Sequence, residues 1–127
     1  SDHPNTVYVV ENYFQNCPYC HDNAPKVDQL AHEFATNPRV QVLDVGIDTS
    51  DSLYQQWIAE EKPNHPVLKD AQRKLTGQLG TSGYPSTYVL DCNLNVKLKT
   101  SGVWSSATTT KIRSAVNQAL TDVCVQE

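Results

Sequence analysis

The segment Cys17–Cys20 reads Cys-Pro-Tyr-Cys and stands between two apolar patterns of different period. Residues 7–10 before it are β-branched and aromatic, which is typical of a buried strand. Residues 24–35 after it place apolar side chains at offsets 0, 3, 4 and 7, which predicts an amphipathic helix. A cysteine pair at this junction restricts the fold strongly, because the two residues between the cysteines, on a helical turn, leave the sulfurs within disulfide reach.

The rest of the chain alternates strand and helix signals before the order changes. Strands are expected at 40–45, 67–68, 87–90 and 96–99, and helices from a cap at Asp51-Ser52, over 74–79, and from Ser105 or Ser106 with Ile112, Val116, Ala119, Leu120 and Val123 on one face. The last two strands flank a polar turn, which predicts a hairpin. The order β-α-β-α-β-α-β-β-α predicts an α/β fold with a central mixed sheet covered by helices on both faces.

The composition suits one domain and argues against several functions. The 127 residues are expected to form a single domain, 1–127, with residues 1–5 as an N-terminal tail. Hydrophobic residues make up 39%, enough for one core, and a net charge of −4 is a poor match for nucleic acid. No apolar run approaches the ~18 residues that a membrane span needs.

The place of the cysteine pair at a helix N-terminus predicts its chemistry. Unpaired N–H groups and the helix dipole favour a thiolate there, so Cys17 is predicted to be the nucleophile. Cys20 lies deeper in the helix and is predicted to be the more shielded, resolving thiol. Two alternatives stay open: a purely structural disulfide, or half of a zinc site, although the chain offers no second close cysteine pair.

Two separate segments resemble thioredoxin-fold proteins, and the resemblance covers residues 7–120. Residues 7–34 resemble the active-site half, and residues 83–90 resemble the loop before the third core strand, whose proline is cis in that family. The matching positions are Glu11, six residues before Cys17, Phe14 at the strand end, Pro25, five residues after Cys20, and Gly102 after the hairpin. Two motifs in the right order are more specific than either alone.

Residues 49–79 are longer than the same region of a plain thioredoxin. Their end, from Pro66 to Gly80, resembles the helix-and-strand insert of TlpA/ResA-type periplasmic thioredoxins. The dipeptide Pro18-Tyr19 is instead the one found in glutaredoxins, and it is closer to DsbA-like motifs than to thioredoxin. The resemblance therefore implies a thioredoxin-like fold with an inserted helix-strand segment around 49–79.

The resemblance also implies roles for the neighbours of the cysteine pair. Tyr84 and a cis Pro85 would hold a substrate backbone beside the sulfurs, together with Pro18 and Tyr19; an ordinary trans turn is the alternative. Tyr13, Tyr19 and Trp104 are candidates for an apolar rim, and simple packing is the alternative for Trp104.

Glu11 would be a buried acid that takes the proton of Cys20, and an exposed glutamate at a sheet edge is the alternative. Asp44 stands on the neighbouring strand where thioredoxins often carry lysine, so two carboxylates are expected to lie close together. The four histidines are assigned no role, although a cationic His21 would add to the stabilisation of a thiolate.

The remaining two cysteines are predicted to meet at the far pole of the domain. Cys92 ends the strand that starts at Pro85, and Cys124 ends the last helix; both elements run away from the dithiol. We expect a structural Cys92–Cys124 disulfide, with two free buried thiols as the alternative. Such a bridge persists outside reducing cytosol, which indicates a periplasmic or other extracytoplasmic protein. The absence of methionine agrees with removal of a signal sequence.

The sequence thus predicts a thiol–disulfide oxidoreductase, more as a reductant than as an oxidant. Its substrates would be protein thiols and disulfides, with a membrane partner for electrons, no nucleic acid, no metal and no cofactor besides the Cys17–Cys20 disulfide. A monomer is expected. The alternatives are a DsbA-like oxidant and a thioredoxin-fold binding or assembly module in which redox activity is incidental.

Overall fold

The computed structural model describes residues 5–124 and contains the predicted elements in the predicted order. The elements are β1 (Val7–Tyr13), α1 (Pro18–Glu33), β2 (Val40–Gly46), α2 (Asp51–Glu61), β3 (Val67–Lys69), α3 (Lys74–Leu79), β4 (Ser86–Leu90), β5 (Val96–Ser101) and α4 (Ser106–Ala119). Most of the predicted N-terminal tail, residues 1–4, lies outside the described residues. Asn5 is described, and its carbonyl accepts a hydrogen bond from Arg39.

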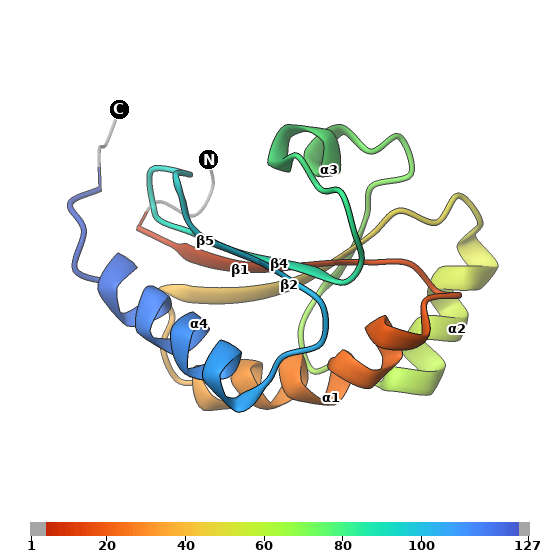
Figure 1. Ribbon diagram of the computed structural model, residues 1–127, viewed down its shortest axis with the longest axis horizontal. Coiled ribbons are helices and arrows are strands. Elements are labelled where there is room, and N and C mark those ends of the chain that lie inside the picture. The colour runs from red at the N-terminus through yellow and green to blue at the C-terminus, as the bar shows by residue number, and fades with distance from the viewer. Residues whose placement is uncertain (1–4, 125–127) are drawn as a thin grey trace.

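The five strands form one mixed sheet in the order β3-β2-β1-β4-β5. β1 is parallel to β2 and antiparallel to β4, while β4 and β5 form the predicted hairpin. Helices α1 and α4 lie under one face of the sheet and α3 lies over the other (Figure 1). The prediction of a mixed sheet covered on both faces is therefore confirmed.

The central strand β1 is three residues longer than its β-branched run predicted. Its pairing with β2 continues to Tyr13 and its pairing with β4 continues to Asn12. Six of its seven residues are buried, because helices cover both faces of the sheet at this strand. The extension carries Glu11 into the interior, which makes this strand the base of the site described below.

Two details of the helix predictions are wrong. The cap of α2 is Ser50 rather than the Asp51-Ser52 pair, and the side chain of Ser50 contacts the Ser52 hydroxyl instead of a backbone N–H. Val123 is 85% exposed rather than part of the core face, because α4 ends at Ala119 and the helical period stops there. The start of α4 is as predicted, since Ser105 caps it by accepting a hydrogen bond from the Thr108 N–H at 3.1 Å.

The insert of residues 49–79 contains α2, the edge strand β3 and α3. Asp70 follows β3 and accepts hydrogen bonds from two backbone N–H groups at the start of α3, those of Leu75 and Thr76, and from the Thr76 hydroxyl. Trp57 of α2 is buried against the end of α1 that carries the cysteine pair. The insert therefore forms one wall of the site.

Replacing Gly46 with alanine is expected to destabilise the fold by about 1–3 kcal/mol, because the added methyl group overpacks the core. A Cβ atom at this position would lie 2.7 Å from Tyr54 and 2.9 Å from Tyr13, both of which are buried. Urea unfolding measures the effect. The matched control is Gly77→Ala within α3, where a Cβ meets no atom within 4 Å and the change is expected to be neutral or stabilising.

Candidate active site

Cys17 and Cys20 form a disulfide at the N-terminus of α1, with their Cα atoms 5.2 Å apart. Cys17 is the N-cap residue, and its sulfur accepts a hydrogen bond from the Cys20 backbone N–H at 3.2 Å. Pro18 occupies the first helical position, where a missing N–H costs nothing. The sulfur of Cys17 is therefore held where an N–H group and the positive end of the helix dipole both favour a thiolate.

An aromatic cluster surrounds the disulfide. Tyr13 and Trp57 are stacked with their ring centroids 4.0 Å apart, and both pack with the two cysteines. Cys17 is 3% exposed and Cys20 is 2% exposed, so the predicted difference in shielding is absent in the disulfide form. Pro18 is exposed and Tyr19 is 65% exposed, which makes them the accessible part of the motif.

The loop before β4 lies beside the disulfide. The Tyr84–Pro85 peptide bond is cis, and the Pro85 carbonyl accepts a hydrogen bond from the Gly102 N–H at 2.8 Å. Tyr84 is half-buried, packs with the two cysteines, and contacts Phe14 edge-on with centroids 5.4 Å apart. The structure thus brings together the two segments of the sequence, around 17–20 and 84–85, that carry the family resemblance.

Glu11 is buried beneath α1 rather than exposed at a sheet edge, with 2% of its surface accessible. Its carboxylate accepts hydrogen bonds from the Asn23 side chain and from the Thr87 hydroxyl, each at 2.6 Å. Burial is the main cause that raises the pKa of Glu11 to about 8; the nearby charge of Asp44 adds to this rise, and the two hydrogen bonds oppose it. Asn23 lies one helical turn after Cys20, so Glu11 sits below the same end of α1.

The wild-type protein is expected to lose folding stability as the pH rises into the neutral and alkaline range. Replacing Glu11 with glutamine is expected to abolish this loss. Because the folded-state pKa of Glu11 is about 8 and the model value is 4.5, the unfolded chain loses this proton first as the pH rises. The stability contributed by the neutral carboxyl is complete below pH 4.5 and declines between 4.5 and about 8, by roughly 3 kcal/mol at pH 7.

Chemical denaturation of wild type and Glu11→Gln between pH 4 and 9 measures this difference. The two curves should converge at low pH and separate above pH 5. The control is Glu33→Gln. The hydrogen bond from Arg113 lowers the pKa of Glu33, so the stability difference between this variant and wild type should change with pH only below pH 5. Parallel curves for wild type and Glu11→Gln would contradict the assignment.

Asp44 lies opposite Glu11 in the parallel pairing of β1 and β2 and is 3% exposed. One carboxylate oxygen accepts a hydrogen bond from the Trp57 indole at 3.1 Å, and the other lies 2.8 Å from His65 Nε2. Sequence reasoning missed His65, which it placed in a Pro-rich loop without a role. The signal that could have found it is Asp44 itself, because a buried acid needs a partner. The loop before β3 covers this part of β2 and supplies that partner.

Both ring nitrogens of His21 are bonded to groups other than the sulfurs. Its ring contacts the Glu61 carboxylate through Nδ1 and the Gln15 carbonyl through Nε2, at 2.6 Å for the latter. Partial burial lowers the pKa of His21, but these two contacts outweigh it, so that the pKa is raised. His21, Glu60 and Glu61 form the one group within residues 5–124 whose ligand atoms are close enough together to hold a metal ion.

Trp104 is part of the core and not of an apolar rim. It is 1% exposed and packs with the cluster between the sheet and helices α1 and α4. Its indole donates to the Thr87 hydroxyl and its backbone N–H donates to the Asn23 side chain, both at 2.8 Å. Trp104 therefore positions the two groups that bind Glu11. Tyr13 is also fully buried, so of the three predicted rim residues only Tyr19 is exposed.

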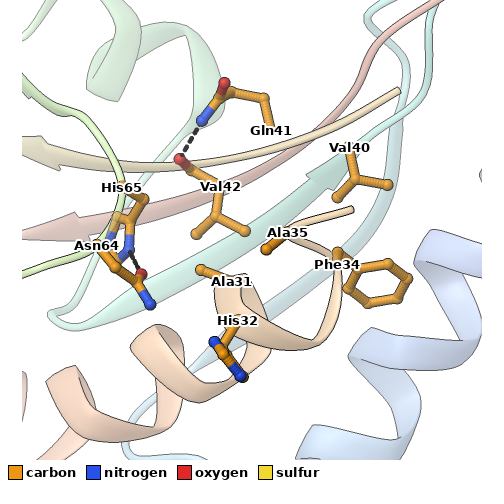
Figure 2. Close-up of a pocket in the computed structure, with 9 residues that line it drawn as sticks. All are labelled: Ala31, His32, Phe34, Ala35, Val40, Gln41, Val42, Asn64 and His65. Atoms are coloured by element: carbon orange, nitrogen blue, oxygen red, sulfur yellow. Dashed lines mark hydrogen bonds between the residues drawn. The ribbon is translucent and has the colours of Figure 1, made fainter. Parts of the chain in front are cut away.

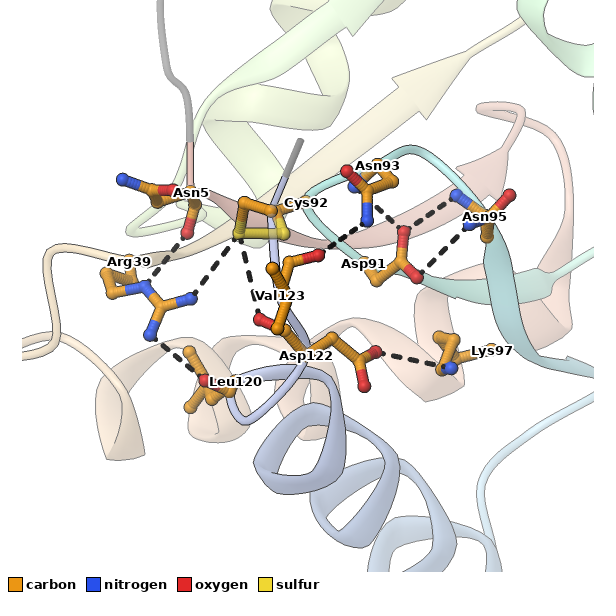
Figure 3. The surroundings of a disulfide bond; sticks show 11 residues. Asn5, Arg39, Asp91, Cys92, Asn93, Asn95, Lys97, Leu120, Asp122 and Val123 are labelled. Atoms are coloured by element: carbon orange, nitrogen blue, oxygen red, sulfur yellow. Dashed lines mark hydrogen bonds and ion pairs between the residues drawn. A yellow bond between two sulfur atoms is a disulfide. The ribbon is translucent and has the colours of Figure 1, made fainter. Parts of the chain in front are cut away.

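Cys92 and Cys124 form a second disulfide at the opposite end of the sheet, with their Cα atoms 5.5 Å apart. Arg39 ties this end together, because its guanidinium donates to the carbonyls of Asn5 and Leu120, at 3.0 Å each, and lies 3.9 Å from the Cys124 sulfur (Figure 3). The disulfide joins the β4–β5 turn to the segment after α4.

The dithiol at a helix N-terminus, the adjacent loop and the mixed sheet together define a thioredoxin-like thiol–disulfide oxidoreductase. The chain belongs to the AhpC/TSA family, whose sequence model matches residues 1–99. No curated protein sequence is similar enough to count as a match.

Three solved structures of similar fold share little sequence identity with this chain. A protein of Chlorobium tepidum that is described as a thiol:disulfide interchange protein, DsbE, has a TM-score of 0.82 at 20% identity, with 94% of this chain and 83% of that chain covered. StoA of Bacillus subtilis has a TM-score of 0.75 at 12% identity, covering 88% and 83%. A secreted disulfide oxidoreductase of Mycobacterium tuberculosis has a TM-score of 0.71 at 16% identity, covering 92% and 84%. These likenesses confirm the predicted thioredoxin-like fold. Within residues 5–124, every helix is too short or too polar to cross a bilayer.

Proposed function

We propose that this protein is an extracytoplasmic reductant of protein disulfides, and the observation that carries the proposal is the Cys17–Cys20 pair at the N-terminus of α1. The Cys17 thiolate attacks one sulfur of a substrate disulfide and releases the other as a thiolate. Cys20 then attacks the Cys17 sulfur and releases the second substrate thiol. The substrate gains two electrons and two protons, and the protein is left with the Cys17–Cys20 disulfide.

Glu11 would take the proton of Cys20 in the second step. The carboxyl lies below the same helix end, and burial raises its pKa to about 8, close to the value that suits a general base near neutral pH. The exposed Tyr19 and Pro18, with Tyr84 and Pro85 beside the disulfide, would form the surface on which a substrate peptide lies.

The proposed direction of electron flow is supported by the few side-chain contacts that would stabilise a Cys17 thiolate beyond its place at the helix N-terminus. A strong oxidant of this type owes its high potential to a stabilised reduced form. Here the sulfur accepts one hydrogen bond, from the Cys20 N–H, and the adjacent His21 is engaged with Glu61 instead. These contacts favour a low reduction potential, and a membrane thiol protein would supply the electrons.

The second disulfide supports an extracytoplasmic location, because disulfides of this kind persist in oxidising compartments. One structure of similar fold is described as secreted. We further propose that residues 1–127 act as one monomeric domain, which light scattering of the purified protein tests directly.

The reduction potential of the Cys17–Cys20 pair tests the direction. Equilibration in glutathione buffers followed by thiol counting should give a value near that of thioredoxin, about −270 mV. A value near −120 mV, the region of DsbA, would make the protein an oxidant and overturn the proposal. Two cysteines should resist reduction in the same titration, since Cys92 and Cys124 form the structural bridge.

A binding or assembly role in which redox is incidental makes a different prediction. The variant with both Cys17 and Cys20 changed to serine would then keep the biological role. Complementation of a strain that lacks the protein separates the two functions, because loss of the role with this variant is expected for an enzyme.

A further inference from the structure

Two buried carboxylates face each other across the centre of the sheet. Glu11 on β1 and Asp44 on β2 are partners in a parallel pairing, so their side chains project from the same face. They are 2% and 3% exposed. Without a counter-charge, ionising both carboxyl groups is energetically unfavourable, because each negative charge disfavours the ionised form of the other group.

Asp44 contacts His65, which lies in the loop before β3. Among residues 5–124, His65 is the only histidine or basic residue whose side chain contacts Asp44. The side chains of both residues are 4% exposed, and His65 Nε2 lies 2.8 Å from an oxygen of Asp44. The other ring nitrogen, Nδ1, faces the Asn64 side-chain oxygen at 3.1 Å and Asp28 at 3.4 Å. Both ring nitrogens of His65 therefore face oxygen atoms, an arrangement that suits a ring which donates two hydrogen bonds.

His65 is also in contact with a cavity that lies away from the dithiol. The cavity has a volume of about 330 Å³ and lies between the C-terminal half of α1 and β2. His65 and Asn64 are at one end of it, and Phe34 and Val40 are at the other (Figure 2).

We propose that His65 is a positioning residue that acts through Asp44 to set the ionisation of Glu11, and through Glu11 the rate at which Cys20 resolves a mixed disulfide. The inference rests on the proposed function, in which Glu11 is the base for Cys20. In that step the proton of the Cys20 thiol moves to the Glu11 carboxylate, and the sulfur electron pair forms the bond to Cys17 while the Cys17–substrate bond breaks. The released substrate thiolate then takes up one proton.

A count of charges gives the direction of the effect. With His65 cationic and Asp44 ionised, the group is neutral when Glu11 is protonated and carries one negative charge when Glu11 is ionised. Without His65 these values become one and two negative charges, so ionisation of Glu11 is harder. The other titratable groups around the three residues are Asp28 of α1, which contacts His65, Tyr13 of β1, whose pKa the charge of Asp44 helps to raise, and His32, which lines the same cavity.

The test follows the resolving step alone as a function of pH. A mixed disulfide between Cys17 and a small aromatic thiol is formed, and release of that thiol is recorded by absorbance between pH 5 and 10. His65→Gln is expected to move the profile to higher pH by about one unit, which slows release about tenfold at pH 7. His65→Lys, which restores a positive charge, should move it back toward wild type. His32→Gln is the matched control and should leave the profile unchanged.

The coupling through Asp44 is tested by a double-mutant cycle. Asp44→Asn should move the profile to lower pH. In the Asp44→Asn background His65→Gln should shift the profile clearly less than it does in wild type, because the carboxylate that His65 contacts is gone. An unshifted His65→Gln profile, or an equal shift in both backgrounds, would overturn the inference. If His65 had only a structural role, the His65 variants would be less stable, but the pH profile of thiol release would not move.

A second measurement keeps this inference separate from the proposed function. The titration of the ¹³C-labelled Glu11 carboxyl by NMR reports its ionisation whether or not the protein reduces any substrate. If wild type failed to exchange disulfides, the proposed function would be wrong, and the same shift between wild type and His65→Gln would still be expected. An unchanged Glu11 titration would reject the role of His65 alone.

Discussion

Replacing Cys17 with serine is expected to reduce disulfide-reductase activity by roughly 10³-fold or more, because the attacking thiolate is lost. The variant is expected to stay folded, so unfolding would not account for the loss of activity. Cys17 is the N-cap of α1, where serine is among the preferred residues, and the aromatic cluster around it is otherwise unchanged. Reduction of insulin disulfides, with turbidity as the readout, measures the activity, and the circular dichroism spectrum verifies the fold.

The matched variant Cys20→Ser separates attack from resolution. It keeps the nucleophile and loses the thiol that completes the cycle, so it should accumulate a mixed disulfide with its substrate. Mass spectrometry after exposure to a disulfide-containing peptide should find the adduct on Cys17 in Cys20→Ser and none in Cys17→Ser. An adduct on Cys20 in the Cys17→Ser variant, at a comparable rate, would reverse the two assignments.

Removing the second disulfide by the double change Cys92→Ser and Cys124→Ser is expected to cost about 3–4 kcal/mol of folding free energy. The bridge closes a loop between positions 32 residues apart, which restricts the unfolded chain. The midpoint of thermal unfolding should fall by roughly 10–15 °C, as measured by calorimetry without reductant. Arg39 still holds Asn5 and Leu120 in the variant, so the far end of the sheet keeps part of its support.

The activity of this double variant should remain close to that of wild type at temperatures where it is folded. The bridge joins the β4–β5 turn to the segment after α4, at the opposite end of the sheet from the Cys17–Cys20 pair. A loss of stability below about 1 kcal/mol would mean that the reduced chain is already constrained there. A large change in the reduction potential of Cys17–Cys20 would show that the two bridges are coupled.

Local patterns in the sequence predicted most of the architecture. Period-2 and period-3.6 apolar runs give the order of strands and helices, and that order implies a mixed sheet. The place of Cys17 at the start of a helix was also predicted, and in the structure it is the N-cap residue of α1. The errors occur where local signals compete, as at Ser50, or where the period continues in the sequence after the helix has ended, as at Val123.

The sequence predicted that residues from the two motifs lie together, and the structure places Tyr84 beside the cysteine pair. This proximity could be predicted because each motif is contiguous in the chain. The expected rim was wrong for Tyr13 and Trp104, because an aromatic side chain in the sequence carries no sign of whether it faces a groove or the core. Trp104 became part of the core because α4 packs over it.

The sequence by itself predicted the class of chemistry, from two thiols at the start of a helix together with a second motif that resembles thioredoxin-fold proteins. The tertiary structure alone decided how the acids beneath that helix are compensated. Glu11 meets Thr87, 76 positions away, and Asp44 meets His65, 21 positions away. These contacts depend on strand register and on how the insert covers β2, and no local period encodes either. The charge balance around Glu11 is therefore a property of the packed sheet.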